Sequence, residues 1–172
     1  MSLPSKLKNL NLFNEGNSYL SLVKSVTLPK LARKMESYRG GGMNGAVKTD
    51  FGMSDDGLTL EWVLGGLDLI VLRQFGAVGV DAIGLRFAGA YQREDDGGVD
   101  AVEIIVRGRH EEIDMGDAKP GEDTEHKIKT PLTYYRLEIN GVVEIEIDLL
   151  NFKEVVGGVD RMAGQRRAIG LA

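Results

Sequence analysis

Apolar and polar residues alternate at every second position in four separate segments, and this periodicity constrains the fold more than any other feature. Residues 58–64 read LTLEWVL, with leucine or tryptophan at each even position. Residues 85–92, 102–107 and 143–148 repeat the same pattern. A period of two is typical of strands with one face on a core, and such strands are usually antiparallel. The sequence therefore predicts a mainly β, antiparallel fold.

A short helix is predicted over residues 66–76, because apolar residues recur there at helical spacing and Gly76 can stop the helix. The apolar residues at this spacing are Leu67, Ile70, Val71 and Phe75.

A second helix is predicted over residues 159–170, at the C-terminal end of the sequence. Asp160 can cap its first turn, Arg166 and Arg167 suit its negative end, and Gly170 can terminate it.

Two long stretches show no clear periodicity and are predicted to be loops. Residues 32–46 are glycine-rich and basic, with a hinge expected at Gly40–Gly42, whereas residues 111–127 are acidic and rich in turn formers. Glycine accounts for 23 of the 172 residues, about twice its usual share of ~7 %. Loops of this length in a compact domain are usually functional or disordered.

The Asn140–Gly141 pair predicts a hairpin, since Asn-Gly favours a tight turn. A two-residue turn would mix apolar and acidic side chains on one face. We therefore expect a three-residue loop at 139–141, with Arg136 opposite Glu144. The outward face of this hairpin would then carry one positive and four negative charges. Its residues are Arg136, Glu138, Glu144, Glu146 and Asp148.

No catalytic motif is apparent in the sequence. The chain has no cysteine and two histidines, His110 and His126, which lie in or beside the acidic loop without the spacing of a known metal motif. The Gly40–Gly42 run lacks the Gly-Lys-Ser/Thr of a phosphate-binding loop. Trp62 is expected in the core. We therefore expect no enzymatic activity, cofactor or metal.

The formal net charge of −5 argues against a nucleic-acid-binding protein, which needs an excess of Lys and Arg on one face. No apolar run approaches the ~20 residues needed to span a bilayer, so no membrane insertion is expected.

Several long blocks of sequence resemble, in order, the major tail tube protein of contractile-tailed bacteriophages, and more distantly the tube proteins of R-type tailocins. The blocks are NLFNEGNSY (11–19), VTLPKLARKMESYRGGGMNGAV (26–47), RFAGAYQ (86–92), GRHEEIDMGDAKPGEDTEHK (108–127), YYRLEINGVVEIEIDLLN (134–151) and GVDRMAGQRRAIGL (158–171).

The resemblance implies a single domain over residues 1–172, folded as a small antiparallel β-barrel or sandwich with a flanking short helix. It implies hexameric rings that stack into the hollow inner tube of a contractile tail. The partners implied are further copies of the chain, the tail sheath protein, and the baseplate or tail initiator and terminator proteins. DNA would pass through the lumen without specific binding, and the protein would belong to the virion and assemble in the host bacterial cytoplasm.

The resemblance also implies contact roles for an N-terminal segment at about 1–18, for the loop 32–46 and for the C-terminal segment. The interface residues expected on this basis are Met35, Tyr38, Arg39, Gly40, Gly41, Gly42, Met43, Asn44, Asp160, Arg161 and Arg166. The acidic hairpin face at 136–148 is expected to line part of the lumen, with a solvent- or sheath-facing position as its rival. The alternative functions are a ring-forming cargo carrier of a related contractile or secretion apparatus, a hydrolase or metal-dependent enzyme built on residues 108–127, and a small-molecule-binding β-barrel.

Overall fold

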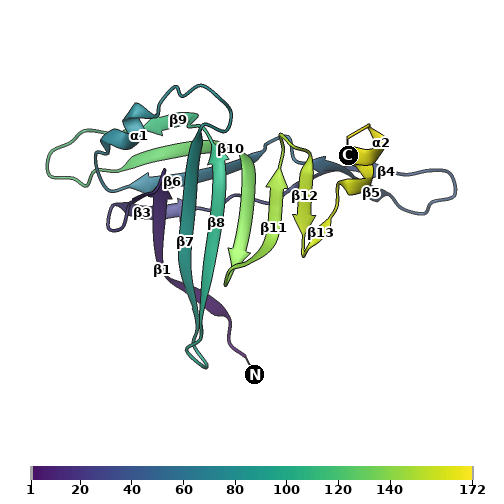
Figure 1. The fold of residues 1–172 in the computed structure, drawn as a ribbon, viewed down its shortest axis with the longest axis horizontal. Coiled ribbons are helices and arrows are strands. Elements are labelled where there is room, and N and C mark those ends of the chain that lie inside the picture. The colour runs from purple at the N-terminus through teal and green to yellow at the C-terminus, as the bar shows by residue number, and fades with distance from the viewer. Residues whose placement is uncertain (1, 172) are drawn as a thin grey trace.

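A large antiparallel sheet dominates the computed structural model, which describes residues 2–171 (Figure 1). This confirms the predicted mainly β class; the layers form an open sandwich and not a closed barrel. The main path of the sheet runs β13-β12-β11-β10-β8-β7-β1-β2. In chain order these strands are β1 (Ser5–Asn14), β2 (Asn17–Ser18), β7 (Ile83–Arg93), β8 (Val99–Gly108), β10 (His126–Ile139), β11 (Val142–Asp148), β12 (Lys153–Val156) and β13 (Val159–Asp160).

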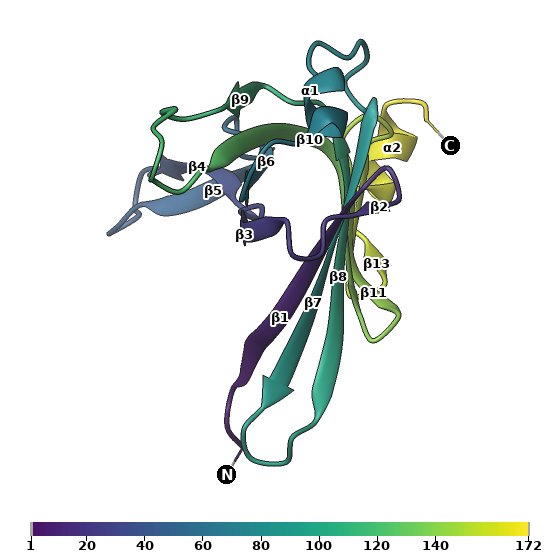
Figure 2. The same cartoon turned by 90° about the vertical axis from the view of Figure 1, so that its left-hand side faces the viewer.

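A smaller layer crosses one end of this sheet and contains β3 (Val23–Thr27), β6 (Leu58–Leu64) and β9 (Glu112–Asp114). The two layers share β10, whose first half pairs with β6 and β9 and whose second half pairs with β8 and β11. Figure 2 shows β10 curving from one layer into the other. The register shifts between Leu132 and Tyr134, where the strand changes layer. Such corners are commonly made by bends or bulges in a shared strand.

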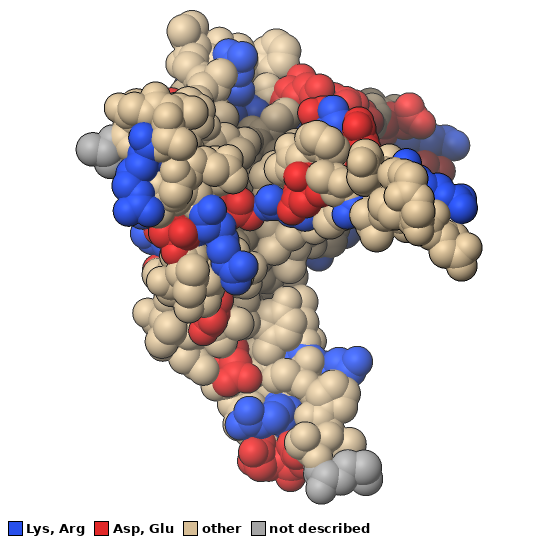
Figure 3. All heavy atoms as spheres, turned by 90° about the vertical axis from the view of Figure 1, so that its right-hand side faces the viewer, with Lys and Arg blue, Asp and Glu red and all other residues tan. Residues whose placement is uncertain are grey.

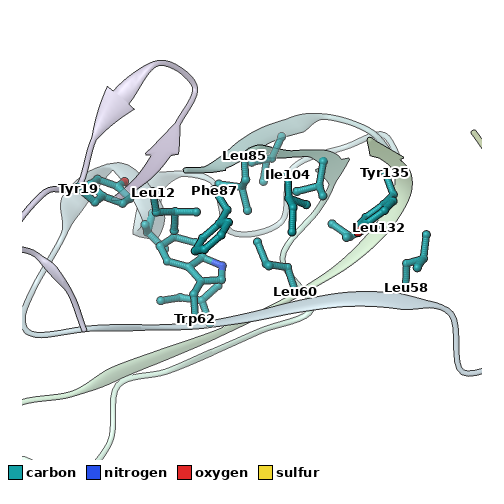
Figure 4. Close-up of a cluster of buried hydrophobic side chains, with 14 of the residues drawn as sticks. Leu12, Tyr19, Leu58, Leu60, Trp62, Leu85, Phe87, Ile104, Leu132 and Tyr135 are labelled. Atoms are coloured by element: carbon teal, nitrogen blue, oxygen red, sulfur yellow. The ribbon is translucent and has the colours of Figure 1, made fainter. Parts of the chain in front are cut away.

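The core lies between these two layers and consists of the residues that the alternation selects (Figure 4). Leu58, Leu60, Trp62 and Leu64 of β6 are all buried, as predicted. The Trp62 ring stacks on Tyr19 with 5.9 Å between ring centroids. Leu85, Phe87, Ile104, Val106, Tyr135 and Ile147 contribute the facing side chains from the large sheet. The periodicity therefore identifies the strands that build the core.

The hairpin between β10 and β11 differs from its prediction. Ile139 pairs with Val142, so Asn140 and Gly141 form a two-residue turn with positive φ angles of 52° and 81°. A register shift follows, and Glu144 is the extra residue of a β-bulge. Arg136 therefore lies opposite Glu146 and not Glu144. The turn follows the preference of Asn-Gly for left-handed geometry, and the bulge restores the apolar face one pair later.

The first predicted helix is shorter than expected. α1 spans Leu69–Arg73, and the Asp68 side chain caps it by accepting a hydrogen bond from the Val71 backbone N–H. Of its apolar residues only Val71 is buried, whereas Leu67 and Phe75 are mostly exposed. The helical spacing is real, but the core accommodates a single side chain of this turn.

The second predicted helix is also shorter, and α2 spans Ala163–Ala168. Residues 159–160 pair as β13 instead, so Asp160 lies before the helix and accepts from the Met162 backbone N–H at 3.0 Å. Gly170, with φ of 88°, ends the helix as predicted. The carbonyl of Arg166, in the last turn of α2, accepts a hydrogen bond from the Leu171 backbone N–H at 2.8 Å.

The prediction of a loop over residues 32–46 is wrong for residues 33–38. β4 (Arg33–Tyr38) pairs with β5 (Val47–Met53) as a separate two-stranded sheet, and only residues 39–46 form its loop. All six residues of β4 are exposed. A strand without a buried face has no need of alternating apolar residues, which is why the period-two signal is absent.

The acidic stretch at 111–127 is largely a loop, as predicted, apart from β9 and the start of β10. Among residues 2–171, no helix is long and apolar enough to cross a membrane.

Candidate assembly surfaces

The large sheet is open at both ends, and its two edges lie on opposite sides of the molecule (Figure 1). At one end β1 pairs with β7 along its length, but on its other side, among residues 2–171, only Phe13 and Asn14 pair, with β2. At the other end, in the same described part of the chain, β13 pairs only with Val155 and Val156 of β12. Unpaired backbone N–H and C=O groups at a sheet edge are a template for pairing with another chain.

The face of the large sheet that points away from the core, here called the polar face, carries most of the predicted lumen residues, with apolar side chains such as Ile105 between them. Arg136 and Glu146 are direct cross-strand partners on this face. Glu138 forms an ion pair with Arg136 at 3.1 Å, and Asp148 lies opposite Tyr134. Glu144 occupies the bulge. The structure thus brings Arg136, Glu138, Glu146 and Asp148 together on one surface.

Neighbouring strands make this face less acidic than the hairpin alone predicts. Arg86 of β7 pairs with Glu103 of β8 at 2.9 Å, and Lys153 of β12 pairs with Glu146. The result is a surface of compensated charges, because most of its carboxylates have a cationic neighbour.

The β4–β5 hairpin projects from the opposite end of the molecule to β1 and carries the predicted residues 35–44 (Figure 1). Tyr38 and Met35 are exposed, and Tyr38 folds over Gly40. The loop is closed by Met43 N donating to Gly40 O, and Arg39 donates to the carbonyls of Met43 and Asn44. The expected glycine hinge is thus a hydrogen-bonded turn. Figure 3 looks at the molecule from this end and shows Lys and Arg side chains along the hairpin.

Arg33 ties the base of the hairpin to the large sheet. Its Nε donates to both Asp50 carboxylate oxygens, at 2.9 and 3.1 Å, and its Nη1 forms an ion pair with Glu154 of β12. The hydrogen bond from the Gly52 backbone N–H holds the pKa of Asp50 below its usual range, and the hydrogen bond from Arg33 contributes to this lowering. A cavity of about 520 Å³ lies beneath this link and is lined in part by Phe51.

The C-terminal residues predicted at an interface are partly engaged within the chain. Arg166 donates to both Asp160 carboxylate oxygens and, at 2.9 Å, to Phe152 O. The hydrogen bonding from Arg166 to the Asp160 carboxylate lowers the pKa of Asp160. Arg161 is exposed. Asp160 and Arg166 therefore stabilise the junction of β12, β13 and α2, while Arg161 remains accessible.

A buried polar network lies behind α1, and sequence reasoning did not find it. Asn14, Gln74, His110 and Thr130 come from four separate segments, so no motif or spacing marks them. Asn14 and Gln74 exchange two amide hydrogen bonds, at 2.7 and 2.8 Å. His110 Nε2 lies 2.9 Å from Gln74 Oε1, and His110 Nδ1 lies 2.9 Å from Thr130 Oγ1. The network joins α1 to the core.

The Asp68 carboxylate sets the direction of the hydrogen bonds that run from Tyr19 to His110 Nε2. Tyr19 donates its O–H to Asp68 at 2.5 Å and accepts from Asn14 Nδ2 at 3.1 Å. This orients the Asn14 amide and, through it, Gln74, whose Oε1 accepts from Nε2–H of His110. In a neutral imidazole with this Nε2–H, Nδ1 accepts from the Thr130 hydroxyl.

Burial lowers the pKa of His110 to about 4, which agrees with this neutral form. Thr130 Oγ1 also accepts from Trp62 Nε1 at 3.2 Å. Both histidines are buried, although the sequence places them in or beside the acidic loop.

Residues 111–125, here called the acidic segment, form the far end of the molecule from the hairpin (Figure 1). The segment contains seven carboxylates and one lysine. Lys24 binds Asp123 and Glu125, at 2.5 and 2.7 Å. Within residues 2–171, no group of three His, Cys, Asp or Glu side chains is placed to hold a metal ion.

Comparison with known proteins gives consistent matches. The family model described as phage tail tube protein FII matches residues 4–170. The chain is 53 % identical over 172 residues to the tail tube protein of Escherichia phage P2, covering 99 % of this chain and 100 % of that protein. It is 40 % identical over 153 residues to the major tail tube protein of Serratia phage KSP20, covering 88 % and 87 % of the two chains.

A chain in the cryo-EM structure of the anti-feeding prophage baseplate has a similar fold. The TM-score is 0.55 at 12 % identity, over 80 % of this chain and 97 % of that chain.

Proposed function

The chain belongs to the phage tail tube protein FII family, and from this premise we propose that six copies join into a ring and that rings stack into a hollow tube. The protein is a structural component of the tail tube of a phage, of the contractile type. The proposal adds the number of subunits, the way they join and the partners of the tube.

The observation that carries the proposal is the pair of open sheet edges at opposite sides of one subunit. Pairing β1 of one copy with the β12–β13 edge of the next would continue the sheet from copy to copy. A contact between two different surfaces is heterologous, and repeated rotation by the same angle closes it into a ring. The axial contacts between rings are also heterologous, and because they do not close they extend the tube.

The polar face of the large sheet is our candidate for the lining of the lumen. The opposite face is occupied by the core, so this is the sheet surface that remains free when the edges are joined. Its paired charges, such as Arg86 with Glu103 and Arg136 with Glu138, offer no basic patch to phosphates. DNA could then pass without specific binding, since tight non-specific binding needs uncompensated Lys and Arg.

We further propose that the assembled tube contacts the tail sheath protein, the baseplate or tail initiator proteins and a terminator. The protein would be made in the host bacterial cytoplasm and act as a virion component. We propose no catalytic role, in keeping with the structural family and with the packing of His110 inside the subunit.

Negative-stain electron microscopy of the purified protein at high concentration, together with light scattering for mass, tests this proposal. Hollow sixfold rings that stack into tubes are the expected result. Discrete rings that never stack and hold another protein in their lumen would favour a cargo carrier instead. A compact monomer that does not assemble even with tail initiator proteins would overturn the proposal.

A further inference from the structure

Building on the proposed tube, we infer that the β4–β5 hairpin of one copy docks by its basic tip on the acidic segment of a second copy. The basic tip is residues 38–48, and the acidic segment is residues 111–125. That copies contact one another belongs to the proposed function; the inference identifies the surface that receives the hairpin and the charges that select it.

The hairpin has no partner within its own subunit along most of its length. β4 and β5 pair with each other and, in residues 2–171, with no other strand. Tyr38 and Val47, which pair across the hairpin at its tip, are 61 % and 54 % exposed. A two-stranded sheet of this kind is only marginally stable without a surface to pack on.

The tip is purely basic. Arg39 and Lys48 are its only charged residues. Among the described residues, Arg39 donates only to backbone carbonyls of its own loop. Within residues 2–171, neither side chain forms an ion pair, in contrast to Arg33 and Lys34 at the hairpin's base. These two cations are free to meet carboxylates of another molecule.

The acidic segment offers carboxylates in a hollow of matching character. Asp114 and Asp117 line a depression of about 440 Å³, together with Glu122, Asp123, Glu125 and Lys127. Lys24 and Lys119 compensate Asp123, Glu125 and Glu122. In the described part of the chain, Asp114 and Asp117 form no ion pair, although Lys127 lies opposite Asp114 in the ladder. The carboxylates of the hollow outnumber these three lysines, so it keeps a net negative charge.

The two surfaces lie at opposite ends of the longest axis of the molecule, so one subunit cannot bring its own tip to its own acidic segment (Figure 1). Their order matches that of the sheet edges. The acidic segment lies at the end that carries β1, and the hairpin lies at the end that carries β12 and β13. A second copy placed to continue the sheet would therefore present its acidic segment toward the tip. This contact is heterologous, as a ring or tube requires.

Cross-linking tests this contact directly, because the chain has no cysteine of its own. The variant Arg39→Cys/Asp117→Cys, assembled and oxidised, should give a ladder of covalent oligomers on a non-reducing gel. Each single-cysteine variant should remain monomeric, because the contact would join unlike positions. A ladder that ends at six places the contact within a ring, and a longer ladder places it between rings.

Charge exchange supplies a second, independent measurement. Arg39→Glu/Lys48→Glu should lower the assembled fraction at least about tenfold, because like charges brought together at an interface repel each other and weaken association. Asp114→Lys/Asp117→Lys should do the same. Combining all four changes in one chain should restore assembly, which general damage to the fold would not allow. Circular dichroism of the unassembled variants checks that each one folds.

The outcomes separate this inference from the proposed function. If the unaltered protein forms no rings or tubes, the proposed function fails. If tubes form but the paired cysteines give no ladder and the fourfold variant is not rescued, the tube stands and this docking contact is overturned.

Discussion

Acidification should destabilise the unassembled subunit through His110, and the buried network allows the size of the effect to be worked out. The folded subunit holds this imidazole neutral, with a pKa of about 4 against an ordinary value of 6.5. The unfolded chain therefore binds the proton more readily, and stability falls as pH drops below 6.5, levelling off only below pH 4. Between pH 7.5 and pH 5 the free energy of unfolding should fall by about 2 kcal/mol.

The network gives this loss a structural cause. A second proton would have to reside on Nδ1, which in the neutral imidazole accepts the hydroxyl hydrogen of Thr130. The pH window also isolates the histidine from carboxylates such as Asp50 and Asp160. The lowered pKa values of these two carboxyls contribute stability that is present at pH values above the ordinary carboxyl pKa. That stability is lost only as the pH falls through the ordinary carboxyl pKa and below it.

Urea denaturation of the unassembled protein at pH 7.5, 6 and 5 measures the effect. His110→Gln keeps an acceptor for Thr130 and a donor for Gln74 but cannot titrate, so the difference between pH 7.5 and pH 5 should largely disappear. His126→Gln is the matched control, because it removes the other histidine and leaves the network intact. If H110Q kept the full pH dependence and H126Q abolished it, the reasoning would be refuted.

Two further predictions follow from packing in the unassembled subunit and are checked by the same denaturation assay. Thr130→Val should lower the free energy of unfolding by about 2–3 kcal/mol, because it leaves the Trp62 indole N–H buried without an acceptor. Thr130→Ser should lower it much less, and equal losses for the two variants would contradict this account. Gly108→Ala should prevent stable folding or lower the free energy of unfolding by about 3 kcal/mol or more. The added Cβ would overlap the Pro131 carbonyl where β8 meets the corner of β10. Gly164→Ala in α2, where an added Cβ meets nothing within 4 Å, should instead stabilise by up to about 1 kcal/mol, and a similar effect at both glycines would count against the close approach at Gly108.

The sequence predicts the strands of the core because those strands have one buried face. Residues 58–64 alternate between buried and partly exposed positions along β6, so their composition directly records the layer that covers them. The β4–β5 hairpin left no such record, because β4 is exposed along its whole length and β5 is exposed except at its last two residues. A period-two signal reports burial on one side, and strands that are exposed along most of their length do not show it.

The charge of the predicted lumen face depended on residues that sequence proximity could not supply. The 132–149 hairpin alone is strongly acidic, but Lys153 reaches the same face from beyond the next turn. Arg86 also reaches this face from a strand distant in sequence, together with its partner Glu103. The polar network has the same character, since Asn14 and Gln74 meet only when β1 and α1 pack together. Both features follow from tertiary contacts, so a single sequence does not reveal them.

The two open edges of the large sheet are each poorly suited to pairing with a copy of themselves, which favours the heterologous contact. β1 carries Lys6 and Lys8 and has a bulge between Leu7 and Asn9, and charge and bulges both discourage edge-to-edge pairing. The opposite edge ends in β13, whose two residues are too short to hold a ladder alone. Backbone pairing between copies would then be weak until contacts outside the ladder hold them in register. A hairpin that reaches the neighbouring copy could supply such a contact, because it adds attraction only when unlike ends meet.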